Sequence, residues 1–105
     1  MGIGPAVAIP EALKKANIKI NDVDVFEINE AFASQATYSV KKLGIPMEKV
    51  NPNGGAIALG HPLGCTGARQ IATLLPELQR SNGRYGVVSM CIGTGMGAAA
   101  VIERE

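Results

Sequence analysis

Residues 51–67 (NPNGGAIALGHPLGCTG) constrain the fold of this chain more than any other segment, because they include five glycines and two prolines. Glycine and proline interrupt helices and strands, so this composition predicts a long structured loop. The regular elements must then lie on either side of the loop and pack against one another across it.

Before the loop, the pattern predicts a helix, a strand and a second helix. Helical spacing of apolar residues predicts a first helix that ends near Asn17, with Pro10 close to its first turn or at the start of its regular part. The apolar and β-branched residues of 23–28 predict a strand that delivers Asn29 at its C-terminal end. A second helix, ending at Gly44, is predicted by an apolar stripe: Phe32, Ala36, Val40 and Leu43.

After the loop, the pattern predicts a third helix and two strands. Apolar residues at helical spacing occupy 68–78, and Pro76 should kink or restart that helix. The apolar runs 84–90 and 97–102 predict two buried strands, joined by a glycine turn at 93–96. The order helix, strand, helix, loop, helix, strand, strand is typical of a layered α/β unit.

Length and composition fit one modest folded domain spanning residues 1–105. The 47% hydrophobic and 18% charged residues are those of a soluble globular protein. A net charge of +1, with scattered basic residues, gives no support to nucleic-acid binding. There is neither a long apolar run nor a signal-peptide pattern, so we expect an intracellular chain with no membrane span.

The two cysteines, Cys65 and Cys91, are too few for a disulfide framework, and we expect both to be thiols. A zinc site built with His61 would need a fourth ligand and a closely spaced cysteine pair, and the sequence offers neither. We therefore expect no metal site.

Asn29, His61 and Cys91 are the candidate functional residues, because each is predicted at a strand end or a defined turn. Asn29 could instead cap the following helix, since asparagine is a favoured cap. His61 is the only histidine and lies between Gly60 and a proline, a setting that could fix an imidazole for proton transfer or serve the fold alone. Cys91 precedes a glycine turn whose amides could face a reacting group, although cysteine on a strand often only packs. We expect Cys65 to pack.

Two other readings of these residues are weaker or stay open. The pattern Gly93-x-Gly95-x-x-Ala98 matches a relaxed dinucleotide fingerprint, but the chain leaves no room after it for a helix or an acidic partner. The set of cysteine, histidine and asparagine would also suit a papain-like hydrolase with Cys91 as its nucleophile. Spacing alone does not decide whether Cys91 is a nucleophile or an acid and base.

Three segments resemble, in order and spacing, the C-terminal motifs of thiolases: residues 29–32 (NEAF), 51–67 and 91–97 (CIGTGMG). The similarity runs from Gly2 through Glu103 and implies the thiolase-like α/β fold, in its C-terminal repeat with a mixed sheet. The amino-acid sequences of these motifs are most similar to those of peroxisomal 3-ketoacyl-CoA thiolases of β-oxidation, with biosynthetic acetoacetyl-CoA thiolases as the alternative.

The resemblance also implies roles for individual residues. His61 would activate a nucleophilic cysteine and help to stabilise the thioester oxyanion, and Asn29 would hold a water at that oxyanion site. Cys91 would act as general acid and base, and Gly93 would offer its amide to a second oxyanion site. Phe32 would line the channel for the pantetheine arm of CoA, which is a substrate rather than a cofactor.

Further expectations concern what lies outside these 105 residues. The family's nucleophilic cysteine belongs to an N-terminal half that this sequence does not contain, so the isolated chain should be inactive. The chain should also begin after the first strand of the repeat, a strand that we expect in the centre of the sheet. A full-length enzyme would be a homodimer acting on CoA thioesters in the peroxisome, or alternatively in the cytoplasm or mitochondrion. A non-catalytic remnant that binds a partner through its sheet edge is the rival interpretation.

Overall fold

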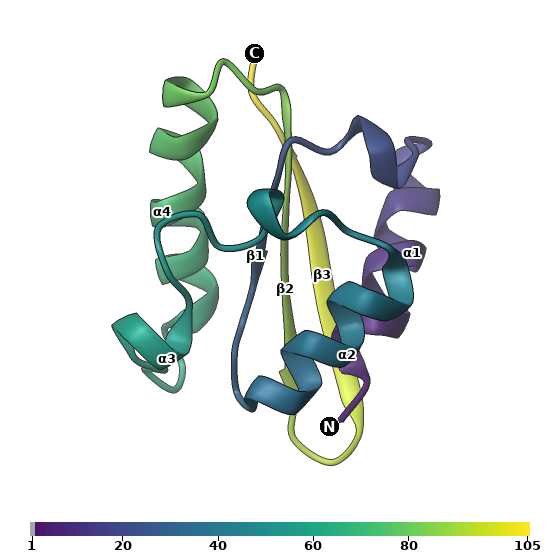
Figure 1. The fold of residues 1–105 in the computed structure, drawn as a ribbon, viewed down its shortest axis with the longest axis vertical. Helices are drawn as coiled ribbons and strands as arrows, with labels where there is room; N and C mark the ends of the chain where they lie inside the picture. Colours follow the sequence, from purple (N-terminus) through teal and green to yellow (C-terminus); the bar gives the residue numbers. More distant parts are fainter. Residues whose placement is uncertain (1) are drawn as a thin grey trace.

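A computed structural model describes residues 2–105 of the chain. The predicted order of elements is confirmed (Figure 1). The regular elements are α1 (Gly4–Ala16), η1 (Ile20–Asp22), β1 (Val25–Ile28), α2 (Ala33–Leu43), η2 (Met47–Lys49), α3 (Ala56–Leu59), α4 (Thr66–Arg80), β2 (Tyr85–Ile92) and β3 (Met96–Glu103). The long loop between η2 and α4 holds only the single turn α3.

The three strands form one mixed sheet in the order β1-β2-β3. β1 runs parallel to β2, with Val25 opposite Gly86 and Ile28 opposite Ser89. β2 and β3 form an antiparallel hairpin in which Cys91 lies opposite Gly97. Direct pairing of β1 with β2 leaves no place for another strand between them. The strand that we expect to be missing could therefore join this sheet only at the outer edge of β1 or of β3, and its presence stays a prediction.

Helices cover both faces of the sheet, as Figure 1 shows with the sheet nearly edge-on. Side chains alternate between faces along a strand, so Phe26 and Val25 of β1 enter different cores. The first core joins α1 and α2 to the sheet and contains Ile9, Leu13, Val23, Phe26, Ile28, Val40, Ile45 and Val87. The second joins α4 to the sheet and contains Val25, Leu74, Leu78 and Val88. The unit is thus a helix–sheet–helix sandwich.

Helix ends follow the sequence signals closely. α1 is followed by Asn17 and α2 by Gly44, both in the left-handed conformation that closes helices. The two internal prolines were predicted less well. Pro10 lies in the interior of α1 rather than at its start, and α4 continues without a break through Pro76. Both prolines lie on exposed positions, so each ring faces away from the sheet.

Two predictions about burial are wrong. β3 was expected to be a buried strand, but every residue in it is half-buried or exposed because β3 lies at the edge of the sheet. Phe32 was expected on the buried stripe of α2, yet its side chain is 53% exposed. Phe32 has an extended backbone just before the helix, which takes it out of the helical register. The residues of α2 that are buried are Gln35, Ser39 and Val40.

Candidate active site

The carboxyl ends of β1 and β2 bring two of the candidate residues to one end of the molecule, the lower end in Figure 1. Asn29 directly follows β1, and Cys91 is the penultimate residue of β2. The backbone N–H of Asn29 continues the ladder by donating to the carbonyl of Ser89 at 2.9 Å. In parallel α/β sheets, ligands bind at this edge of the strands.

A cavity of about 610 Å³ opens at this end. Four of the five predicted site residues line it, namely Phe32, His61, Cys91 and Gly93. Its other lining residues are Ala31, Leu63, Gly64, Thr66, Gly67, Met90 and Ile92. The fifth predicted residue, Asn29, lies behind His61 and is fully buried.

His61 is held between two polar side chains. Its Nδ1 lies 2.5 Å from Oγ1 of Thr66, and its Nε2 lies 3.5 Å from Nδ2 of Asn29. The Thr66 hydroxyl donates its single hydrogen to the carbonyl of Pro62 at 3.2 Å, so it accepts from Nδ1–H of His61. The Asn29 amide nitrogen can only donate, so Nε2 is an acceptor. Both contacts fit the tautomer with its proton on Nδ1 and its lone pair on Nε2.

Asn29 does not cap a helix. The residue at the N-cap of α2 is Phe32, and it makes no side-chain capping hydrogen bond. The Asn29 side chain turns instead toward the imidazole, and its Oδ1 has no hydrogen-bond partner among the described residues. A buried acceptor of this kind can bind a water or a ligand group at the floor of the site.

Glycines set the position of Cys91. A Cβ built on Gly4 of α1 would lie 3.1 Å from Cα and 3.2 Å from Cβ of Cys91, so the helix packs directly on this residue. Gly97, opposite Cys91 on β3, also contacts the backbone of Gly4. The turn after Cys91 passes through positive φ at Thr94 (67°) and Gly95 (88°). A Cβ on Gly93 would meet open space, so the turn leaves this part of the cavity free.

Cys65 is not packed, contrary to expectation. It is exposed and occupies the residue before α4, outside the cavity lining. The loop carries it to the surface while His61, four residues earlier, faces the cavity. Of the two thiols, Cys91 is therefore the one that reaches the site.

Sequence reasoning missed a buried polar layer beneath the site. Glu27 on β1 is fully buried, and its Oε2 lies 3.6 Å from Nη1 of Arg69 on α4. Burial raises the pKa of the Glu27 carboxyl from 4.5 to about 7, although the Arg69 guanidinium acts in the opposite direction. A glutamate within an otherwise apolar strand, two residues before Asn29, was the available signal.

Thr66 was also missed, and so was Gln70. Both are buried on α4 together with Leu74 and Leu78, at successive intervals of four residues. Polar residues that continue the stripe of buried leucines were the signal for these two.

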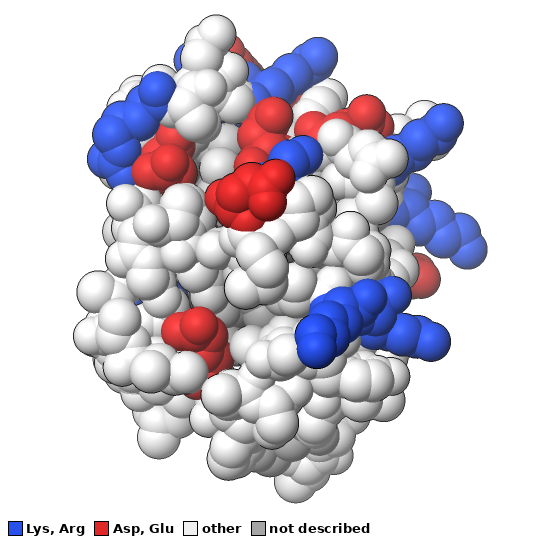
Figure 2. Space-filling model, in the orientation of Figure 1, with Lys and Arg blue, Asp and Glu red and all other residues white. Residues whose placement is uncertain are grey.

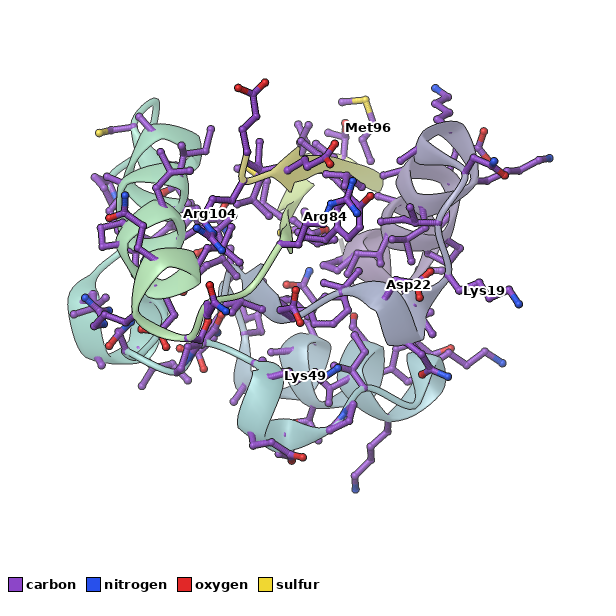
Figure 3. All side chains as sticks on the ribbon, turned by 90° about the horizontal axis from the view of Figure 1, so that it is seen from above. Lys19, Asp22, Lys49, Arg84, Met96 and Arg104 are labelled. Atoms are coloured by element: carbon purple, nitrogen blue, oxygen red, sulfur yellow. The ribbon has the colours of Figure 1, made fainter. Side chains whose placement is uncertain are left out.

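The lining of the cavity contains no Lys, Arg, Asp or Glu. Figure 2 shows that the lowest part of this face is formed by uncharged side chains, whereas Lys, Arg, Asp and Glu lie higher, with an acidic patch and a basic group just below the middle. Figure 3 looks onto the upper end, where Lys49 donates to the carbonyl of Val23 and Arg84 pairs with Glu103. The cavity thus opens on a largely neutral surface.

Within residues 2–105, no group of three or more His, Cys, Asp and Glu side chains is arranged to hold a metal ion. The same residues contain no helix long and apolar enough to cross a membrane.

The helix–sheet–helix fold and the motifs around its cavity define a thiolase domain. The family described as "Thiolase, C-terminal domain" matches residues 1–104, and the chain belongs to this family. The resemblance seen in the three motifs is confirmed.

The chain is also similar to individual thiolases over nearly its whole length. The chain is 78% identical over 104 residues to peroxisomal 3-ketoacyl-CoA thiolase B of Mus musculus, covering 98% of this chain and 24% of the relative. It is similar to the dimeric peroxisomal thiolase of Saccharomyces cerevisiae, with a TM-score of 0.92 and 63% identity over 99% of this chain and 26% of that one. Acetyl-CoA acetyltransferase of Bacillus anthracis gives a TM-score of 0.93 and 49% identity over 97% of this chain and 26% of that one. The chain therefore spans about a quarter of the length of its relatives.

Proposed function

We propose that the chain supplies the acid–base half of a peroxisomal 3-ketoacyl-CoA thiolase, which cleaves a 3-ketoacyl-CoA with CoA to give acetyl-CoA and a shortened acyl-CoA. The observation that carries this proposal is the contact of Asn29 with Nε2 of His61, beside a cavity that Cys91 also lines. The mouse relative, at 78% identity, favours this subtype over that of the Bacillus anthracis acetyl-CoA acetyltransferase, which is 49% identical.

In the first half-reaction, a cysteine outside these 105 residues would pass its proton to Nε2 of His61 in place of the 3.5 Å contact from Asn29, and would attack the 3-keto carbon. The bond between C2 and C3 would then break, leaving the acyl group on that cysteine. The departing acetyl-CoA carbanion would take its proton from the thiol of Cys91. The oxyanion that develops on the thioester oxygen would be stabilised by His61 and by a water held on Asn29. Each preorganised donor of this kind is typically worth about 10²–10³ in rate.

In the second half-reaction, the Cys91 thiolate would take the proton of incoming CoA. The CoA thiolate would attack the acyl group, and the released cysteine would recover its proton from His61. The amide of Gly93 would face the oxyanion in the second site, and Phe32 would line the entry for the pantetheine arm. These two half-reactions need no metal or redox group, and CoA is one of their substrates. We expect a homodimer, as in the yeast relative.

A direct test grafts this chain in place of the matching segment of the mouse relative and measures thiolysis of acetoacetyl-CoA with CoA. The graft should be active, and His61→Ala should abolish formation of the acyl-enzyme because the base is lost. Asn29→Ala should be milder because it removes a water-mediated donor. Rapid acylation in the His61 variant, or a silent graft that is correctly folded, would contradict the proposal.

A further inference from the structure

Gln70 on α4 makes an unusual pair of contacts with the sheet. The side chain is fully buried, and its Nε2 donates to the carbonyl of Glu27 at 3.0 Å and to the carbonyl of Ser89 at 2.9 Å. An amide nitrogen carries two hydrogens, and both neighbours are acceptors, so the network fixes the orientation of this amide. One side chain thus ties β1 to β2 from the helix side.

The two carbonyls lie at equivalent places relative to the site. Glu27 is two residues before Asn29, and Ser89 is two residues before Cys91. The Ser89 carbonyl also accepts the backbone N–H of Asn29 at 2.9 Å. The side-chain amide of Gln70 therefore binds both strands just before their candidate site residues, Asn29 and Cys91.

The same helix also holds His61. Thr66, one turn before Gln70 on the buried side of α4, accepts the hydrogen bond from Nδ1 of the imidazole. A shift of α4 relative to the strand ends would therefore change the distances among the three candidate catalytic residues together.

Burying the amide side chain of Gln70 at this position lowers the stability of the fold relative to an apolar side chain. The Oε1 of Gln70 is buried and has no hydrogen-bond partner among the described residues. Leucine or methionine would fill a similar volume beside Leu74 without burying an unpaired acceptor. The bonds made by Nε2 are what an apolar residue would not provide.

We propose that Gln70 is a positioning residue. It holds the carboxyl ends of β1 and β2 at the spacing that lets Asn29 and Cys91 act on one substrate. It also fixes the positions of both strand ends relative to His61, which lies on the loop before α4. This role rests on the acid–base function proposed above for the same site.

The first experiment compares Gln70→Leu with Gln79→Leu in the graft. Gln79 is exposed on the same helix, so its replacement makes the same chemical change away from the sheet. Gln70→Leu should lower kcat by about ten- to a hundredfold while KM for CoA stays near its original value, because misplacing reacting groups by about 1 Å has effects of that size. Gln79→Leu should change neither. If Gln70→Leu does not fold, Gln70→Met takes its place.

A second variant separates positioning from mere filling of space. Gln70→Glu keeps the shape, but an ionised carboxylate only accepts hydrogen bonds and would face two carbonyl oxygens. Protonation would restore one donor, so the activity relative to wild type should rise as the pH is lowered. A ratio that does not change with pH would contradict the proposal.

A third measurement does not depend on catalysis. Iodoacetamide should alkylate Cys91 at a different rate in Gln70→Leu, with exposed Cys65 as the internal reference and Gln79→Leu unchanged. A silent parent graft with this altered ratio would refute the thiolase function and leave the positioning role standing. An active parent in which Gln70→Leu alters neither kcat nor the alkylation ratio would refute the positioning role.

Discussion

Replacing Thr66 by valine removes one hydroxyl from the site while keeping its shape. That hydroxyl accepts the Nδ1–H of His61 at 2.5 Å and donates to the carbonyl of Pro62 at 3.2 Å, so it fixes both the tautomer and the direction of the imidazole. A hydrogen bond between neutral groups contributes about 1 ± 0.5 kcal/mol net. Since about 1.4 kcal/mol is a factor of ten, the acylation rate should fall roughly two- to twelvefold.

Single-turnover acylation of the graft measures this effect directly, because it isolates the step in which His61 acts as the base. Thr73→Val is the matched control, since the Thr73 hydroxyl donates to the Arg69 carbonyl, accepts from Nη1 of Arg69 at 3.4 Å and makes no hydrogen bond to His61. An unchanged acylation rate in Thr66→Val, or an equal loss in Thr73→Val, would refute the argument that Thr66 selects the tautomer.

Three other predictions follow from the site and the core. Cys91→Ser should lower thiolysis by orders of magnitude, because serine is a poorer proton donor and acceptor, whereas Cys65→Ser should be harmless; the reverse result would reassign the functional thiol. The folded pKa of Glu27, about 7, lies above 4.5, so the free energy of unfolding should fall by up to about 3 kcal/mol as the pH rises through that window. Urea titrations should show this fall in the wild type and not in Glu27→Gln. Gly86→Ala should cost about 1–3 kcal/mol, because its Cβ would lie 2.6 Å from Cδ1 of Leu74, and adding Leu74→Ala should cost less than the sum of the two single changes.

The order of elements could be predicted because it depends on local signals. The glycines and prolines of 51–67 placed the loop, and the helix ends at Asn17 and Gly44 were fixed by left-handed residues. The candidates at the strand ends were found because a strand followed by a polar residue and a helix is a local pattern. The motifs of the family then supplied their proposed roles.

What could not be predicted depends on partners distant in the sequence. The exposure of β3 follows from its place at the sheet edge, and its run of small apolar residues does not reveal that place. The contact between Asn29 and His61 spans 32 residues and depends on the path of the loop. The bonds of Gln70 reach strands 43 residues before it and 19 residues after it, and its own sequence neighbours do not record them.

The central place of β2 has a consequence for how the site comes apart. β2 is the strand with a partner on each side, so its amides should exchange hydrogen for deuterium most slowly, while the outward amides of β3 exchange first. Opening from that edge would remove Gly97 from Cys91 while β1 and β2 stayed paired. Asn29 and the imidazole would then remain in place after Cys91 had lost its pairing with β3, so heat or denaturant should disturb proton transfer at Cys91 before it disturbs His61.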